Sequence, residues 1–342
     1  MSQTRLSPVL SICVAVFNVE DFLEECLSSL HKISSPQVEI LLINDCSTDG
    51  SKRICERYAA KDIRVDVINH GINKGLLQVR KTGITSSTGK YILFVDGDDK
   101  VIPEKLSEFI KILNCMHEDI VQFGVICFGK PNFAPEKYQY PFSVDSLTHT
   151  NDLLKIQSDI FVKGKIPWNV FNKFYKRELA VKAASAIDEK NITSGEDAFL
   201  TFILTELATS YSTYPVYCYA YRIGSGISKG DETIEKFAIH VKDIKIPSLI
   251  EDFFNANLKR GYNETALKNL YFRLLELTIK RFWNLPLKEK AEGLKFLAEV
   301  RIPKKNVVFF GFLILLKNFS HFILPIGSSR RELIKNIWHS LK

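Results

Sequence analysis

Apolar runs of strand length alternate with helical patterns along the first third of the chain. Between the first two runs, the apolar residues have the i, i+3, i+4, i+7 spacing of a single helix face: Leu23, Cys26, Leu27 and Leu30. The runs themselves predict strands at Leu10–Phe17, Val38–Ile43, Val65–Ile68, Tyr91–Val95 and Ile120–Phe128. Strands that alternate with helices indicate βαβ units, so we predict an α/β fold with a mostly parallel sheet and flanking helices.

Polar residues follow three of the predicted strands. Asn18 follows the first strand, the stretch Asn44–Asp49 follows the second, and Asp96–Asp99 follows the fourth. Ligands of parallel sheets bind beyond the carboxyl ends of the strands. We therefore expect these side chains to line a binding site at one edge of the sheet.

The second part of the chain has a different pattern. From about residue 232 it is helical to the end, with breaks at proline and glycine. A length of 342 residues fits two domains. We predict a first domain over residues 1–230, with halves at about 7–128 and 129–230, and a helical C-terminal appendage over 231–342.

The positive charge is concentrated in the last part of the chain. The net charge is +7, and residues 301–342 hold eight Lys or Arg and one Glu, so the rest is neutral overall. The run VVFFGFLILL in this tail is shorter than the about 20 apolar residues that span a membrane. It fits a helix at an anionic membrane surface, or a helix packed on the protein's own core with solvated basic ends. The basic residues follow no nucleic-acid-binding motif, so we expect no nucleic acid partner.

The cysteines and the N-terminal apolar run bear on the cellular compartment. The seven cysteines are widely spaced and form no Cys-x-x-Cys pair, which argues against a disulfide framework and a zinc site. The apolar run at 9–17 lacks the basic segment and the cleavage site of a signal peptide. We expect a cytoplasmic protein.

The stretch FVDGDDK at 94–100 places three carboxylates within four residues at a predicted strand end. Such a cluster suits a hard divalent cation, Mn²⁺ or Mg²⁺, which often shares its oxygen ligands with substrate phosphates. In the alternative interpretation, Asp98 or Asp99 caps a helix that opens near Pro103.

Two common phosphate-binding motifs are absent from the sequence. It has no Gly-x-Gly-x-x-Gly after the first strand and no Gly-x-x-x-x-Gly-Lys-Ser/Thr loop. A nucleoside diphosphate would then be held by a metal ion and basic side chains. Arg80 is a candidate for that contact, or it is a solvated helix residue.

Four segments, in this order and spacing, resemble the amino-terminal half of family 2 glycosyltransferases. They are SICVAVFNVEDFLEECLSSL, EILLINDCSTDGS, NKGLLQVRKTGI and GKYILFVDGDD, and the resemblance covers about residues 7–225. It implies the A-type nucleotide-sugar transferase fold and a catalytic domain over residues 1–230. The bacterial members that it most resembles build lipopolysaccharide, capsule or related surface glycans on lipid carriers.

The resemblance implies how a UDP-sugar donor would be bound. Asp45 would hydrogen-bond the uracil, with Ala15 and Phe17 lining the base pocket. Arg80 would lie near the base or the diphosphate. Ala15 stands where the family usually has proline, and Cys46 where it usually has glycine, which affects the backbone of that turn.

The resemblance also implies a metal site in the Asp-x-Asp motif. Asp98 would bind the metal ion that bridges the diphosphate, and Asp96 would contact the ribose or the metal. Asp99 is a candidate for a third member of the site.

The stretch SGEDAFL at 194–200 has two interpretations. Ser194 and Asp197 fit a capping box at the start of an apolar helix. The resemblance implies instead that Asp197 is the general base and that Glu196 positions it or replaces it in that role. Both functions are compatible, because a carboxylate in a first helical turn is favoured by the helix dipole.

These observations predict an inverting, metal-dependent transferase. It would move a hexose or N-acetylhexosamine from a UDP-sugar to a lipopolysaccharide, capsule or other lipid-linked glycan acceptor, in peripheral contact with the cytoplasmic face of the inner membrane. One alternative is a sugar nucleotidyltransferase on a related fold, whose glycine-rich amino-terminal loop is missing. The other is a non-catalytic partner of a membrane glycan assembly complex.

Overall fold

The computed structural model describes most of the chain, and its residues form two compact units, Met1–Lys229 and Gly230–Lys342. Each unit is treated by itself below. The described residues are 7–129, 144–185, 187, 192, 194–224, 232–257 and 261–300.

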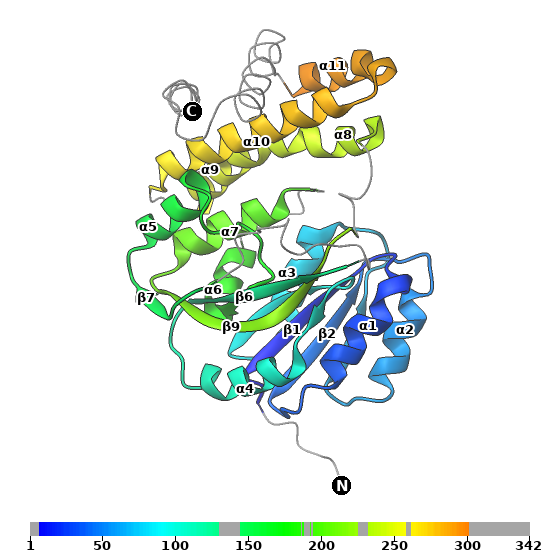
Figure 1. The fold of residues 1–342 in the computed structure, drawn as a ribbon, viewed down its shortest axis with the longest axis vertical. Coiled ribbons are helices and arrows are strands. Elements are labelled where there is room, and N and C mark those ends of the chain that lie inside the picture. The colour runs from blue at the N-terminus through cyan, green and yellow to red at the C-terminus, as the bar shows by residue number, and fades with distance from the viewer. Residues whose placement is uncertain are drawn as a thin grey trace, which may run out of the picture. The chain divides into compact units, whose positions relative to one another are not determined.

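The first unit is built on one mixed sheet (Figure 1). Within the described residues, the order along the sheet is β3-β2-β1-β4-β8-β6-β9-β5, and β7 pairs with β9. The strands are β1 (Leu10–Val16), β2 (Val38–Asn44), β3 (Val65–Asn69), β4 (Tyr91–Asp96), β5 (Lys100–Val101), β6 (Ile120–Phe128), β7 (Thr148–Thr150), β8 (Lys173–Lys176) and β9 (Tyr211–Arg222).

The predicted α/β architecture is confirmed. The strands β1 to β4 are parallel to one another where they pair, whereas β8 runs antiparallel to both β4 and β6. The five strands predicted from the apolar runs all occur, with ends within one residue of the prediction. β1 ends at Val16, so Phe17 lies just beyond the strand and is 46% exposed.

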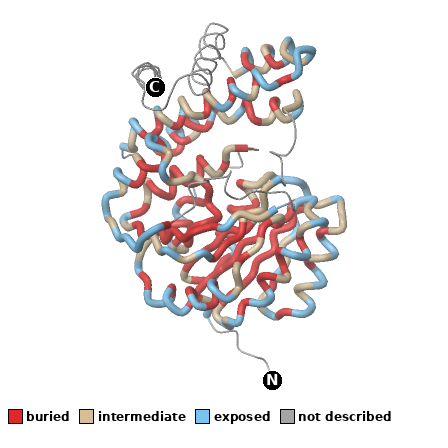
Figure 2. Tube along the Cα trace, in the orientation of Figure 1, coloured by how far each residue is buried: buried red, intermediate tan, exposed pale blue. Residues whose placement is uncertain are grey.

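Helices cover both faces of the sheet, and its central strands β1, β2 and β4 are almost wholly buried (Figure 2). The residues of β1 that alternate along the strand, such as Ile12 and Val14, join the core that contains Leu23 and Leu27. The residues between them face the other way, and Cys13 lies against α3 beside Gly83. The helices of this unit are α1 (Glu20–His31), α2 (Ser51–Ala59), α3 (Leu76–Ser86), α4 (Pro103–Leu113), α5 (Leu153–Gln157), α6 (Arg177–Ala184) and α7 (Glu196–Leu207).

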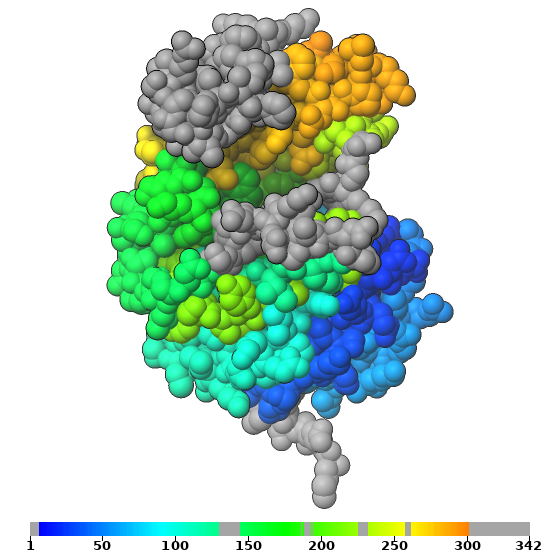
Figure 3. Space-filling model, viewed as in Figure 1, coloured from blue at the N-terminus to red at the C-terminus, as the bar shows by residue number. Residues whose placement is uncertain are grey.

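The surface of this unit reflects the order of the chain. In the space-filling view, α1 and α2 are blue, α4 is cyan and the segments around α5 are green, and each forms a separate area of the visible face (Figure 3).

The predicted helix that opens at Pro103 is α4, in which proline takes the first turn. Its N-cap residue is Ile102, with no side-chain cap, so the alternative in which Asp98 or Asp99 caps this helix is wrong.

The second unit is helical in its described residues. Its helices are α8 (Ile234–His240), α9 (Ile246–Asn257), α10 (Glu264–Asn284) and α11 (Lys290–Glu299). Asn263 caps α10 by accepting a hydrogen bond from the backbone N–H of Ala266 at 3.0 Å. Phe237 of α8 packs against Phe282 of α10 with ring centroids 6.1 Å apart, which places these helices around a shared core.

No helix among the described residues is both long enough and apolar enough to cross a membrane. The basic, apolar tail at 301–342 lies outside the described residues, so both interpretations of it remain predictions.

Candidate active site

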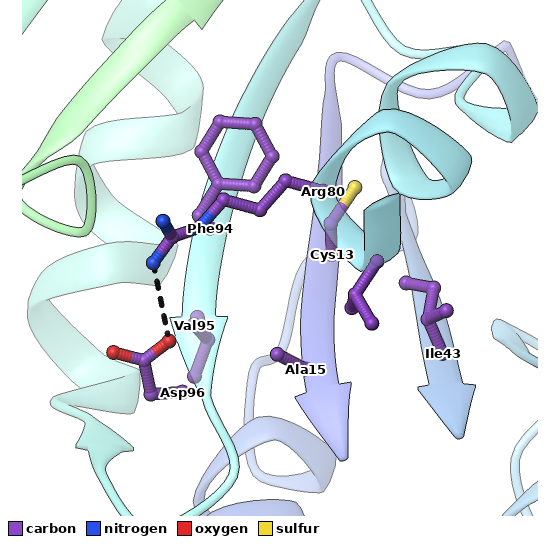
Figure 4. A pocket seen from close by; sticks show the side chains of 8 residues that line it. Cys13, Ala15, Ile43, Arg80, Phe94, Val95 and Asp96 are labelled. Atoms are coloured by element: carbon purple, nitrogen blue, oxygen red, sulfur yellow. Dashed lines mark ion pairs between the residues drawn. The ribbon is translucent and has the colours of Figure 1, made fainter. Parts of the chain in front are cut away.

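A small hollow lies at the carboxyl ends of β1, β2 and β4, the edge at which the sequence predicts a ligand site. Figure 4 shows Ala15 at the end of β1, and Arg80 extending over the strands toward Asp96 at the end of β4. The lining residues are Cys13, Ala15, Ile43, Val79, Arg80, Phe94, Val95 and Asp96.

Arg80 is the centre of the site. Its side chain is 3% exposed, and its guanidinium contacts three carboxylates from two separate elements. Nη1 lies 2.5 Å from Oδ1 of Asp197 and 3.0 Å from Oε1 of Glu196, and Nη2 lies 3.7 Å from Oδ1 of Asp96. The structure therefore joins the Asp-x-Asp motif to the Glu-Asp pair, which lie about a hundred residues apart in sequence, through one buried cation. The alternative in which Arg80 is a solvated helix residue is wrong.

Burial and charge oppose one another at this cation. Burial disfavours the charged guanidinium, but the carboxylates of Asp197, Glu196 and Asp96 outweigh that effect and raise the pKa of Arg80. Burial raises the pKa of Glu196 to about 7, although the Arg80 charge lowers it. Burial likewise raises the pKa of Asp96, against the lowering by Arg80. The site thus carries one permanent positive charge, and the pKa values of two of its carboxyl groups, Glu196 and Asp96, lie above their usual range.

Asp45 fixes the segment that leads into α3. It is 2% exposed, and its carboxylate accepts hydrogen bonds from the backbone N–H groups of Lys74 at 2.9 Å and Gly75 at 2.8 Å. It also lies 2.7 Å from Nδ1 of His70, whose other ring nitrogen is 2.9 Å from Oγ1 of Thr82. Gly75 has φ 82°, a conformation that favours glycine, and α3 begins at the next residue. Asp45 therefore helps to place Arg80, one turn into α3.

The turn after β2 has a left-handed residue at Cys46. Cys46, which stands where the family usually has glycine, has φ 61°. This left-handed conformation is strained for a residue with a side chain. Nevertheless, Asn44 accepts a hydrogen bond from the N–H of Ser47 at 3.1 Å, and Asn18 accepts one from the N–H of Thr48 at 2.8 Å. The turn is thus tied to the end of β1.

The Asp96–Asp99 turn packs closely on the end of β1. The N–H of Gly97 donates to the carbonyl oxygen of Ala15 at 3.0 Å, and the N–H of Asp99 donates to the carbonyl oxygen of Asp96 at 3.0 Å. Asp98 is partly exposed on this turn, whereas Asp99 is 1% exposed. A side chain at Gly97 would place its Cβ 2.8 Å from the Ala15 oxygen and 3.0 Å from Cγ2 of Val19.

We expect Gly97→Ala to push this turn away from β1. The backbone oxygen cannot yield as a side chain could, so the variant should lose about 1–3 kcal/mol of stability. Gly71→Ala is the matched control, because a Cβ at Gly71 would meet no atom within 4 Å. Thermal melting of both variants measures the effect. Equal melting temperatures for the two would contradict the predicted clash.

The Glu-Asp pair begins α7, and its neighbours differ from the predicted capping box. The N-cap residue is Gly195 with φ 68°, and no side-chain hydrogen bond caps the helix there. The capping-box interpretation of Ser194 and Asp197 is therefore wrong. The Asp197 side chain is 25% exposed while its Oδ1 is buried against Arg80, so its other oxygen is the one that solvent and a substrate can reach.

The carboxylates of the turn fit part of a divalent cation site. In the part of the chain that the structure describes, no group of three or more His, Cys, Asp or Glu residues is arranged to hold a metal ion alone. Asp98 and Asp96 lie two residues apart at the open edge of the sheet, and carboxylate oxygens are the ligands that Mn²⁺ and Mg²⁺ prefer. These two residues fit a cation that takes its remaining ligands from phosphates and water.

The structure brings together most of the residues singled out in the sequence, but not all of them in one cluster. Asp96, Glu196 and Asp197 surround Arg80, and Ala15 lines the same hollow. Phe17 is exposed at the end of β1, and the Asp45 carboxylate is engaged by the protein's own N–H groups.

Sequence reasoning missed the buried Lys173. It is 0% exposed, and its Nζ donates hydrogen bonds to the backbone carbonyl oxygen of Asn169 at 2.7 Å and to Oδ1 of Asn172 at 2.8 Å. Burial lowers its pKa to about 7, and the Asp197 charge opposes this. It stabilises the loop before β8, whose Trp168 accepts a hydrogen bond from Thr201 of α7 at 2.7 Å. The sequence signal that could have indicated this burial is a lysine next to apolar residues in a strand-like pattern.

The chain is similar in sequence to known glycosyltransferases. Residues 11–176 match the model of the family described as Glycosyl transferase family 2. The uncharacterized glycosyltransferase EpsJ of Bacillus subtilis (strain 168) is 36% identical over 191 residues, which are 56% of this chain and 54% of EpsJ. The putative glycosyltransferase EpsH of the same strain is 30% identical over 226 residues, which are 64% of this chain and 61% of EpsH. The chain thus spans only about half to six-tenths of the length of these relatives.

The fold also matches solved structures. S. aureus TarS 1–349, in a crystal structure with UDP-GlcNAc, aligns with a TM-score of 0.61 at 20% sequence identity, over 85% of this chain and 80% of that one. The fold is therefore the A-type fold of nucleotide-sugar transferases. Residues 11–176, just under half of the chain, match family 2 glycosyltransferases, which confirms the resemblance seen in the sequence.

Proposed function

We propose that the protein transfers a sugar, a hexose or N-acetylhexosamine, from a UDP-sugar to a hydroxyl of a bacterial surface glycan or its lipid-linked precursor. The observation that carries this proposal is the cluster in which Arg80 joins Asp96 to Glu196 and Asp197. The names of similar proteins support the substrates: TarS was crystallised with UDP-GlcNAc and with UDP, and TuaG of Bacillus subtilis is a putative teichuronic acid biosynthesis glycosyltransferase.

The donor would lie along the edge of the sheet. The base would be held near Ala15 and Phe17, with Asp45 either contacting the uracil directly or fixing the loop beside it. Asp96 and Asp98 would hold a divalent cation, which supplies Lewis-acid stabilisation of the charge that grows on the departing diphosphate. Arg80 adds a second positive charge behind Asp96, at 3.7 Å.

The acceptor would be activated by Asp197. The accessible oxygen of Asp197 would take the proton of the acceptor hydroxyl. As it does so, the hydroxyl oxygen would attack the anomeric carbon from the face opposite the diphosphate. Attack from the opposite face inverts the configuration at that carbon. Glu196, more buried than Asp197, would hold the Arg80 guanidinium in place rather than contact the acceptor. Arg80 in turn keeps Asp197 oriented at the start of α7.

Where the reaction takes place is part of the proposal. The acceptors of surface-glycan synthesis are carried on lipids, and the eight basic residues of the tail at 301–342 flank apolar runs. Basic residues beside apolar ones favour the anionic surface of a membrane. We therefore propose peripheral contact with the cytoplasmic face of the inner membrane.

The test is calorimetric titration of the full chain with UDP, GDP, CDP and dTDP, with Mn²⁺ and then with a chelator. We expect UDP to bind best and its affinity to fall at least about tenfold without the metal, since a cation held by Asp96 and Asp98 would supply positive charge for the diphosphate. Asp98→Asn should abolish the metal dependence, and Asp21→Asn on the surface of α1 should not change it. If no nucleotide bound in either condition, the chain would be a non-catalytic partner and the proposal would fail.

A further inference from the structure

Asp99, the third carboxylate of the motif, points away from the candidate cation site. Its two oxygens accept hydrogen bonds from strand β9: Oδ2 from the hydroxyl of Tyr219 at 2.7 Å, and Oδ1 from the backbone N–H of Arg222 at 2.6 Å. The side chain is 1% exposed. A cation at Asp99 would compete with two buried donors for the oxygens of the same carboxylate.

The same strand also holds the backbone of the turn. The Tyr219 hydroxyl accepts a hydrogen bond from the N–H of Asp96 at 3.2 Å, and Nε of Arg222 donates to the carbonyl oxygen of Asp98 at 2.7 Å. Four hydrogen bonds therefore join β9 to the Asp96–Asp99 turn, and they reach the residues on both sides of Gly97. The peptide groups that carry the Asp96 and Asp98 side chains are thus fixed from outside the site.

Arg222 is itself held firmly. Its guanidinium lies over the rings of Phe128 and Phe22, 4.4 and 4.9 Å from their centroids, and it pairs with Glu25 of α1. Hydrogen bonds from Lys100 and Arg222 lower the pKa of Glu25, so this carboxylate stays ionised. Contacts from α1, β6 and β5 therefore set the position of the residue that bonds the Asp98 carbonyl group.

We propose that Tyr219, Asp99 and Arg222 form a brace that positions the Asp98 carboxylate for the cation, and that Asp99 is a positioning residue and not a third ligand. The inference rests on the proposed function, because it concerns the same cation site. Residues that orient metal ligands in this way commonly change metal affinity or activity by about 10–100-fold when they are replaced. The brace also links the cation turn to the end of β9.

Tyr219→Phe tests the brace with the least disturbance. It removes only the hydroxyl that connects Asp99 to the N–H of Asp96, and the ring keeps its packing against Phe171 at 4.9 Å. Tyr217→Phe is the matched control on the same strand, since Tyr217 is 37% exposed and not part of the brace. Asp99→Ala and Asp99→Asn form a second pair, in which asparagine keeps an oxygen for the Arg222 N–H.

The measurements are UDP affinity at several Mn²⁺ concentrations by calorimetry, and thermal melting of each variant. We expect Tyr219→Phe to bind UDP about tenfold more weakly at low Mn²⁺ and to recover at saturating Mn²⁺. It should melt somewhat below the wild type, because the Asp96 N–H and Oδ2 of Asp99 lose their buried partner. We expect Asp99→Asn to restore most of the affinity that Asp99→Ala loses.

Three outcomes would count against the inference in different ways. Wild-type affinity in Tyr219→Phe at every Mn²⁺ concentration would overturn the brace and leave the proposed function intact. Loss of all metal dependence in Asp99→Asn, as severe as in Asp98→Asn, would make Asp99 a ligand and also overturn it. A wild-type protein that binds no UDP with Mn²⁺ would refute the proposed function, and the brace with it.

Discussion

Asp197→Asn is expected to lower the rate of sugar transfer by about 10²–10⁴-fold, the usual contribution of a positioned general base. Asparagine has nearly the same shape but cannot take the proton of the acceptor hydroxyl. The variant should bind UDP and Mn²⁺ as tightly as the wild type, because Asp197 acts on the acceptor side of the proposed reaction. Initial rates with a UDP-sugar and a membrane extract, together with UDP titration, separate the two effects.

A control on the same helix makes this result specific. Glu206→Gln changes a carboxylate near the other end of α7, ten or so residues from the site, and should leave the rate unchanged. Glu196→Gln is informative as well: if it removed activity while Asp197→Asn kept near-normal rates, Glu196 would be the base. Near-normal activity in both variants would refute the proposed mechanism.

Arg80→Met is expected to damage both stability and activity. Methionine keeps much of the side-chain length but removes the charge that contacts Asp96, Glu196 and Asp197 together. Breaking a buried ion pair by deleting one partner costs about 3–5 kcal/mol, because the other charges stay buried and unpaired. The melting temperature should fall by several degrees or more. Arg53→Met, at an exposed arginine of α2, is the control and should melt like the wild type.

Arg80→Met should also change the pH at which the carboxyl group of Glu196 ionises. The Arg80 charge lowers the pKa of Glu196, which is about 7 in the wild type because of burial. Without Arg80 this pKa rises, so a higher pH is needed to ionise the carboxyl group. The midpoint of the Glu196 carboxyl titration, followed by NMR, should therefore move to higher pH in Arg80→Met. A variant with wild-type stability and an unchanged Glu196 titration would show that the cluster does not depend on Arg80.

Periodicity and polar residues at strand ends were sufficient to predict much of the first unit. The strands β1, β2 and β4 are mostly apolar runs because helices cover both faces of the sheet, and such runs are visible without any knowledge of partners. β8 was harder to predict because it is only four residues long and contains Lys173. β9 contains Pro215, and its register against β6 is irregular, so its pattern is interrupted.

Local sequence motifs were enough to identify the residues available for chemistry. Asp96, Asp98, Glu196 and Asp197 stand in local motifs, and their carboxylates follow predicted strands or begin a predicted helix. Periodicity reports only on the neighbours of a residue along its own element, so it can place these groups at the edge of the sheet. It cannot report which of them face one another.

The roles of Arg80 and Asp99 depend on contacts between distant segments, which are visible only in the folded protein. The structure shows that Arg80 of α3 is buried and contacts three carboxylates, so it is not a surface residue. It also shows that Asp99 accepts hydrogen bonds from β9, which anchors the turn to that strand. The physical reason is the same in both cases. A charged or polar group that is removed from water must find partners, and the fold determines which partners are within reach.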